Sequence, residues 1–297
     1  MKVLNTFVAL LGATVALSPC AAAVAQETGS IGVGSQYDSA HVYVDLAELD
    51  RFVDSFTATF GGKSTARTSL TVTPTPSTTV FRAVSTPEGL ISAFGFTTPI
   101  PYPFGLERTG YLVTDLDKAV SVARANGAAV VVAPFPDPIG RDAIVQWPGG
   151  VFMQFYWHTT PPSYAPLATV PENRIYVSPD RADEFIRDFL GFAGGKIASD
   201  DAAAPGVEVG TPNETFRRVR IESAFGKVTV LVTDGHLPYP YGRETTGYAV
   251  TDLAGTLQKA VRSGAVVLVK PYPSDGREAA VVQFPGGYIA EIHADAR

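Results

Sequence analysis

The chain of 297 residues carries a formal net charge of −6, with 45% hydrophobic and 18% charged residues. This composition is typical of a globular protein of about two domains. The acidic balance and the lack of a basic run in the sequence speak against nucleic acid as a partner. Nothing in these quantities predicts the oligomeric state.

The first 25 residues have the pattern of a secretory signal peptide. Lys2 gives a positive start, residues 8–17 form a short apolar core, and Ala23-Val24-Ala25 is a small-residue cleavage site. The apolar run is too short to span a bilayer well. We therefore expect residues 1–25 to direct export, to the periplasm or out of the cell. The only cysteine, Cys20, lies in this segment, so a mature chain would have no disulfide.

The next part of the chain predicts a leader and then the first structural unit. Residues 26–40 are polar and rich in Gly and Ser, which indicates a flexible leader. Residues 41–44 are predicted to form a strand. Phe52, Phe56 and Phe60 are spaced four apart, as in the apolar stripe of a helix. Three strand-like runs complete the unit.

A second unit of the same kind follows. Residues 110–113 are predicted to form a strand, and Thr114 or Asp115 to cap a helix that ends at Gly127. Three further strands are expected, over 129–133, 143–147 and 151–157. Each half of this domain is therefore strand, helix and three strands.

An ordered internal repeat decides the domain organisation. Six short motifs of residues 101–158 recur in the same order in 238–293, for example Gln146-Trp147-Pro148-Gly149-Gly150 and Gln283-Phe284-Pro285-Gly286-Gly287. The chain is thus a tandem duplication. We predict domain 1 over 41–158, a Pro-rich linker over 159–172 and domain 2 over 173–297. Residues 200–213 are longer and richer in Ala, Gly and Pro than their counterpart, which predicts a mobile loop.

Doubled strand–helix–three-strand units that end in a Pro-Gly-Gly turn resemble the glyoxalase / bleomycin-resistance / extradiol-dioxygenase superfamily, or vicinal oxygen chelate (VOC) superfamily. The resemblance covers about 41–158 and 173–293. It implies an α+β fold of two tandem domains, each a pair of βαβββ units that form an incomplete barrel around a cavity. It implies no single activity, because this fold carries many chemistries.

Metal-dependent members of this superfamily place ligands on three strands: the first strand, the strand that opens the second unit, and the last strand. The resemblance assigns these positions in the two domains to two sets: His41, Arg108 and Gln154, and Arg174, Thr245 and Glu291. Arginine cannot bind a cation, and glutamine is a weak substitute for a carboxylate. We therefore expect no cofactor and no metal site. A divalent metal stays an alternative if Glu107 or Glu244 completes a site.

Strand alternation predicts that polar side chains of these strands face the cavities. The candidate catalytic residues are His41, Glu291 and His293. The candidate ligand-binding residues are Tyr43, Arg108, Gln154, Tyr156, Arg174 and Tyr176. His41 is open to three roles: a hydrogen-bonded inner histidine, a general base or a residual metal ligand. Glu291 is open to two: an ion pair with Arg174, or a base with a raised pKa if the cavity is dry.

Three classes of function stay open. The first is a protein that binds a small oxygenated or aromatic organic molecule, for sequestration or scavenging. The second is a metal-free lyase, isomerase or cyclase that moves protons with His41 or with Glu291 and His293. The third is a metal-dependent dioxygenase or glyoxalase-type lyase with an atypical site. Predicted export favours the first, because glutathione and reduced iron are scarce outside the cytoplasm. Either domain could hold the working cavity.

Overall fold

The computed structural model describes residues 30–296. The predicted signal peptide and the start of the predicted leader lie outside this range. Within it, four units of strand, helix and further strands follow one another along the chain. No helix between residues 30 and 296 has the length and apolar character needed to cross a membrane.

The four units have the following bounds. The first contains β1 (Ser39–Tyr43), α1 (Leu49–Phe60), β2 (Lys63–Ser64), β3 (Thr68–Leu70), β4 (Thr79–Thr86) and β5 (Gly89–Phe96). The second contains β6 (Arg108–Leu112), α2 (Leu116–Ala125), β7 (Ala129–Pro136), β8 (Gly140–Gln146) and β9 (Phe152–His158). The third contains β10 (Glu172–Val177), α3 (Ala182–Ala193), β11 (Lys196–Pro205), β12 (Thr215–Ser223) and β13 (Gly226–Val232). The fourth contains β14 (Thr245–Ala249), α4 (Leu253–Arg262), β15 (Val266–Ser274), β16 (Arg277–Gln283) and β17 (Ile289–Asp295).

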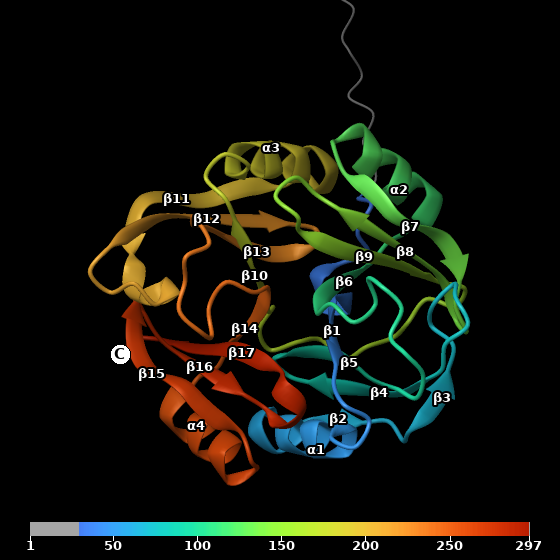
Figure 1. Ribbon diagram of the computed structural model, residues 1–297, viewed down its shortest axis with the longest axis horizontal. Helices are drawn as coiled ribbons and strands as arrows, with labels where there is room; N and C mark the ends of the chain where they lie inside the picture. Colours follow the sequence, from blue (N-terminus) through green and yellow to red (C-terminus); the bar gives the residue numbers. More distant parts are fainter. Residues whose placement is uncertain (1–29, 297) are drawn as a thin grey trace, which may run out of the picture.

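Two curled sheets are built from pairs of units (Figure 1). In domain 1, β1 pairs antiparallel with β6, and the order is β2-β4-β5-β1-β6-β9-β8-β7, with β3 also on β4. In domain 2, β10 pairs antiparallel with β14, and the order is β11-β12-β13-β10-β14-β17-β16-β15. The predicted α+β fold of two tandem domains, each a pair of βαβββ units, is confirmed.

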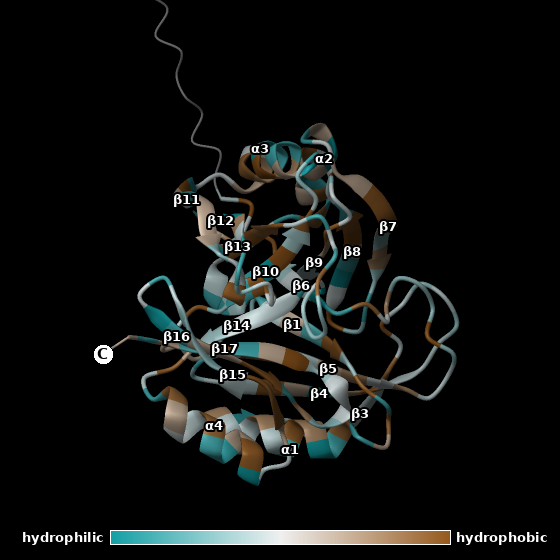
Figure 2. Ribbon diagram, turned by 60° about the vertical axis from the view of Figure 1, so that its left-hand side comes forward, coloured by the Kyte–Doolittle hydropathy of each residue, from teal (hydrophilic) through white to brown (hydrophobic). Residues whose placement is uncertain are grey.

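The helices form where the sequence predicts them. Asp115 caps α2 by accepting a hydrogen bond from the Lys118 amide at 2.9 Å, and Asp252 caps α4 in the same way at the Gly255 amide, at 3.0 Å. Figure 2 shows hydrophobic and hydrophilic residues alternating along α1 and α4, as expected of helices with one face on a sheet. The alternate residues of β9, such as Met153 and Phe155, are buried on the helix side of their sheet.

The helices also pack across the domain boundary, which the sequence does not predict. On one side α1 and α4 share a core in which Phe56 lies 5.2 Å from Phe284, between ring centroids. On the other side α2 and α3 share a core in which Phe192 stacks on Phe155 at 5.1 Å. The four units therefore form a closed ring, and both cores contain residues of both domains (Figure 1).

In two segments predicted to be flexible, the described residues make specific contacts. Within the predicted leader, the amide of Val33 donates to Leu112 at 3.0 Å, Ile31 packs against the core, and β1 begins at Ser39. The predicted mobile loop 200–213 contains the end of β11 and a 3-10 helix, Gly206–Val209. Asp200 in this segment is paired with a neighbouring strand: Arg217 of β12 donates to both of its carboxylate oxygens, at 2.9 and 2.7 Å. The linker ends one residue early, because β10 starts at Glu172.

Two equivalent carboxylates of the repeat meet at the junction between the domains. Glu107 and Glu244 line the same small cavity of about 10 Å³, next to Tyr288. The Thr109 amide donates to Glu244 at 3.3 Å. Burial raises the pKa of Glu107 to about 7, although Arg243 opposes this. Burial likewise raises the pKa of Glu244 to about 8, and the negative charge of Glu107 adds to the shift.

Candidate functional site

The barrel of domain 1 holds a cavity of about 350 Å³. That volume is within the range of sites for small organic molecules, about 300–1,000 Å³. Aromatic and aliphatic side chains form most of its wall: Tyr43, Leu70, Val72, Phe81, Ile91, Phe94, Phe104 and Tyr156. The rings of Tyr43 and Phe94 are stacked, with centroids 5.2 Å apart and planes at 19°. Such a wall suits a flat apolar molecule.

Two further apolar side chains of this cavity are exposed to solvent. Ile139, in the turn between β7 and β8, is 58% exposed, and Tyr164, in the linker between the domains, is 37% exposed. These residues mark the side on which the cavity meets water. The linker therefore contributes to the site as well as connecting the domains.

The polar part of the cavity is a chain of three buried side chains. Arg108 of β6 donates to the amide oxygen of Gln154 on β9 from Nε, at 3.1 Å, and from Nη2, at 2.7 Å. The amide nitrogen of Gln154 donates to Oδ2 of Asp142 on β8 at 2.8 Å. Burial raises the pKa of Asp142 well above its usual value, and Arg108 offsets this only in part. Burial therefore favours the protonated form of Asp142, compared with an exposed aspartate.

His41 lies beside this chain, in contact with aromatic rings. Its ring is edge-on to Phe94, with centroids 5.6 Å apart, and its Nδ1 is buried without a hydrogen-bond partner among residues 30–296. Burial lowers the pKa of His41 to about 3, and the charge of Arg108 acts in the same direction. At neutral pH His41 is therefore an uncharged imidazole and a very weak base.

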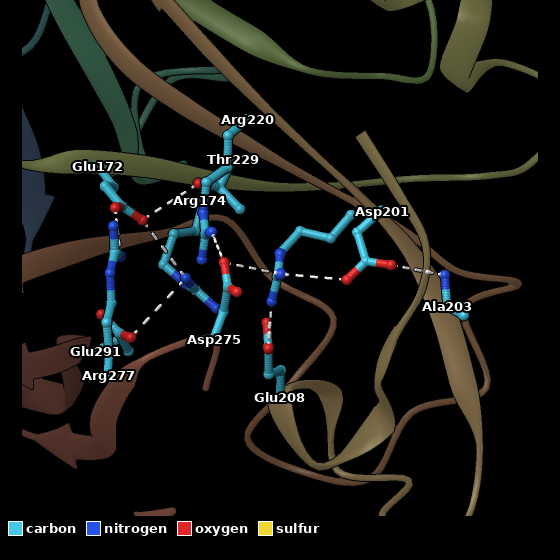
Figure 3. Close-up of polar contacts among 11 residues, drawn as sticks. Glu172, Arg174, Asp201, Ala203, Glu208, Arg220, Thr229, Asp275, Arg277 and Glu291 are labelled. Carbon is cyan, nitrogen blue, oxygen red and sulfur yellow. Dashed lines mark hydrogen bonds and ion pairs between the residues drawn. The ribbon is translucent and has the colours of Figure 1, made fainter. Parts of the chain in front are cut away.

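In domain 2 the equivalent positions hold an ion-pair network (Figure 3). Glu172 replaces Ser39, Arg174 replaces His41, and Glu291 replaces Gln154. Nη1 of Arg174 lies 3.8 Å from Oε1 of Glu291 and 3.7 Å from Oε2 of Glu172. Oε1 of Glu172 accepts a hydrogen bond from Arg277 at 2.6 Å, and His293 contacts Glu291 at 2.7 Å. Positive and negative charges alternate through the interior of this barrel.

The arginines keep both carboxylates of this network ionised. Burial raises the pKa of Glu172, but Arg277 and Arg174 outweigh it and bring the pKa to about 2. Burial also raises the pKa of Glu291, and Arg174 and His293 outweigh it in the same way, so that the net shift is downward. Glu291 is therefore the partner of Arg174 and not a carboxylate with a raised pKa.

A second ionic cluster lies next to the first one (Figure 3). Arg218 of β12 is buried and pairs with Glu208, which is also buried, and with Asp275 at 3.1 Å. Arg220 pairs with the same Asp275. This part of domain 2 is held together by charged side chains where domain 1 has a cavity.

The structure brings the predicted site residues together in two separate groups. His41, Tyr43, Gln154 and Tyr156 line the domain 1 cavity, and Arg108 is bonded to Tyr43 and Gln154. Arg174, Glu291 and His293 meet in domain 2, with Tyr176 near Arg174. Asp142 was not predicted, although an acidic residue within the otherwise apolar run 142–145 was a usable signal. Glu172 was not predicted either: besides Arg174 on its own strand, its partners Arg277 and Thr229 come from two other strands.

No family model matches the sequence, and no curated protein matches it. Solved structures do match. A mutant of 4-hydroxymandelate synthase from Streptomyces coelicolor superposes with a TM-score of 0.58 at 13% identity, over 89% of this chain and 94% of that one. The fold is that of the vicinal oxygen chelate superfamily. The Mn(II)-bound glyoxalase from Novosphingobium aromaticivorans gives a TM-score of 0.55 at 12% identity, over 90% of this chain and 84% of that one.

A third VOC structure, the 2,3-dioxygenase LapB from Pseudomonas sp. KL28, gives a TM-score of 0.53 at 13% identity, over 87% of this chain and 91% of that one. The resemblance expected from the repeat is thus confirmed for the fold. At these identities it carries no activity to this chain.

The side chains at the expected metal positions do not fit a divalent cation. In domain 1 the oxygen of Gln154 accepts two hydrogen bonds from Arg108, whose positive charge would repel a metal ion at that oxygen. In domain 2 Arg174 stands between the carboxylates of Glu172 and Glu291. Among residues 30–296 no group of three His, Cys, Asp or Glu side chains is arranged to hold a metal ion.

Proposed function

We propose that this protein binds a small, uncharged, aromatic organic molecule in the cavity of domain 1, for sequestration or scavenging. The observation that carries the proposal is the largely aromatic and aliphatic cavity of about 350 Å³, in which His41 has a pKa of about 3 and is uncharged at neutral pH. Burial of apolar surface supplies the binding free energy in such a site, at about 25 cal/mol per Å². We further propose that domain 2 supports this site structurally.

Two observations favour binding over proton transfer. His41, whose pKa is about 3, is too weak a base to remove a proton at neutral pH. Glu291 is held ionised by Arg174 and His293, within a barrel filled with charged side chains. A metal-dependent reaction lacks a fitting ligand set for the reasons given above. Export, which the N-terminal sequence predicts, remains part of the proposal and suits a scavenger.

A cavity-filling variant tests the proposal. Ala83 lines the domain 1 cavity, so A83W should fill it, whereas Ala202, an exposed residue of β11, offers a matched substitution in domain 2. We expect wild-type protein to bind a neutral naphthalene probe at one site per chain, as measured by fluorescence titration. A202W should bind it equally well, and folded A83W should bind it at least tenfold more weakly. Equal binding by A83W, or no binding by wild-type protein, would refute the proposal.

A further inference from the structure

The hydroxyl of Tyr43 lies in the cavity with a charged side chain, Arg108, as its hydrogen-bond partner. It accepts a hydrogen bond from Nη2 of Arg108 at 3.0 Å, and the guanidinium also lies 5.5 Å from the centroid of the Tyr43 ring. The structure describes no acceptor for the proton of this hydroxyl within residues 30–296. A hydroxyl that accepts from a cation is polarised and becomes a stronger donor.

All the N–H groups of Arg108 donate to other groups of the protein, so none is free to bind a ligand. Nε and Nη2 donate to Gln154, Nη2 also donates to Tyr43, and Nη1 donates to the carbonyl oxygens of Pro103 and Leu106, at 3.1 and 2.7 Å. An anionic ligand would therefore lose its hydration without gaining a direct contact with the guanidinium. A cationic ligand would be repelled by the same charge. The hydrogen bond from Arg108 makes the Tyr43 hydroxyl a stronger donor toward a ligand in the cavity.

We propose that the ligand carries an uncharged oxygen acceptor, such as a ketone or ester carbonyl, on its aromatic ring, and that the Tyr43 hydroxyl donates to this oxygen. The inference rests on the proposed binding function and narrows the class of ligand. The ring of Tyr43 lines the cavity and stacks on Phe94, so an aromatic ligand against this wall has the hydroxyl at its edge. The carbonyl oxygen of Gln154 accepts from Arg108, and one of its two N–H groups donates to Asp142.

Two probes of the same shape test the inference: 2-acetylnaphthalene, which has the oxygen, and 2-ethylnaphthalene, which lacks it. Y43F should weaken binding of the ketone about two- to tenfold, the effect of one hydrogen bond, and leave binding of the hydrocarbon unchanged. Tyr176 is the equivalent residue of domain 2, and Y176F should change neither affinity. Hydrocarbon binding by Y43F also verifies that its cavity is intact.

A second readout is the carbonyl stretching frequency of the bound ketone, measured by infrared spectroscopy. It should be lower in wild-type protein than in Y43F, because a donated hydrogen bond weakens the carbonyl bond. Unchanged ketone affinity and an unchanged frequency in Y43F would overturn the inference while the binding function stands. Tighter binding of 2-naphthoate than of the ketone would overturn the inference that the oxygen acceptor of the ligand is uncharged. If wild-type protein binds neither neutral probe, the proposed function itself fails.

Discussion

Gln154 and Glu291 are equivalent residues of the two repeats, and each faces an arginine inside its own barrel. Gln154 accepts two hydrogen bonds from Arg108 and donates one to Asp142, whereas Glu291 forms an ion pair with Arg174. The exchange of an amide for a carboxylate is one of several differences between the open barrel of domain 1 and the ion-paired barrel of domain 2. This difference is consistent with the proposed roles of ligand binding for domain 1 and structural support for domain 2.

The first prediction concerns the ion pair of domain 2. E291Q should lower the free energy of unfolding by about 3 kcal/mol, at the low end for breaking a buried pair, because Glu172 still faces Arg174. Denaturation by urea measures this. Binding of the naphthalene probe in domain 1 should stay within about twofold of wild type. A loss of probe binding in folded E291Q would contradict a purely structural role.

The second prediction concerns the Glu107–Glu244 pair at the domain junction. Both folded-state pKa values, about 7 and about 8, lie above the unfolded value of about 4.5, so the folded protein binds more protons. The stability contributed by these groups is complete below pH 4.5 and is lost as the pH rises through 7 and 8. Thermal unfolding between pH 5 and 9 should show this loss.

The matched control is the double variant E107Q/E244Q, which cannot titrate at the junction. It should unfold with a much smaller pH slope between pH 5 and 8, and at pH 9 it should be more stable than wild type, by an amount on the order of 2 kcal/mol. An identical slope in both proteins would show that the two carboxylates do not titrate in this range.

Binding in domain 1 should not depend on pH near neutrality. His41 has a lowered pKa of about 3 and stays uncharged from pH 5 to pH 8. The affinity for 2-acetylnaphthalene should therefore be constant within about twofold from pH 5 to pH 7. A transition near pH 6.5 that disappears in H41Q would mean that His41 titrates in the cavity.

The last prediction concerns metal. Wild-type protein should keep no tightly bound iron, zinc, nickel or manganese after dialysis, because Arg108 and Gln154 occupy expected ligand positions. The double variant R108H/Q154E would place two imidazoles and one carboxylate at these positions with His41, and it should gain binding of a divalent metal. Elemental analysis measures both. About one metal ion per chain in wild-type protein would contradict the assignment.

The fold could be predicted to a large extent because a repeat doubles the evidence for each element. The helix stripe of Phe52, Phe56 and Phe60 and the helix cap Asp115 depend on neighbours close in sequence. The packing of α1 on α4 and of α2 on α3 was out of reach, because an apolar stripe does not specify its partner. Residues 200–205, the end of β11, fall in the segment predicted as a loop, because their aspartates are paired with Arg217 and Arg218 of another strand.

The orientation of a site residue could be predicted where it depends on alternation along one strand, and less well where it depends on side chains of several strands. Alternation along β1 and β9 correctly placed His41, Tyr43, Gln154 and Tyr156 around one cavity. The proximity of Arg174 and Glu291 was also predicted correctly, at 3.8 Å. Which barrel is open depends on the sum of Glu172, Arg277 and their neighbours, and only the assembled structure displays that sum.

The most direct test of the account is a crystal structure of the protein soaked with 2-acetylnaphthalene. We predict density for one molecule per chain, in the domain 1 cavity between Phe81 and Tyr156, with the ketone oxygen within hydrogen-bond distance of Tyr43 and the ion pairs of domain 2 undisturbed. Density inside the barrel of domain 2, with Arg174 and Glu291 separated by the probe, would contradict the central claim.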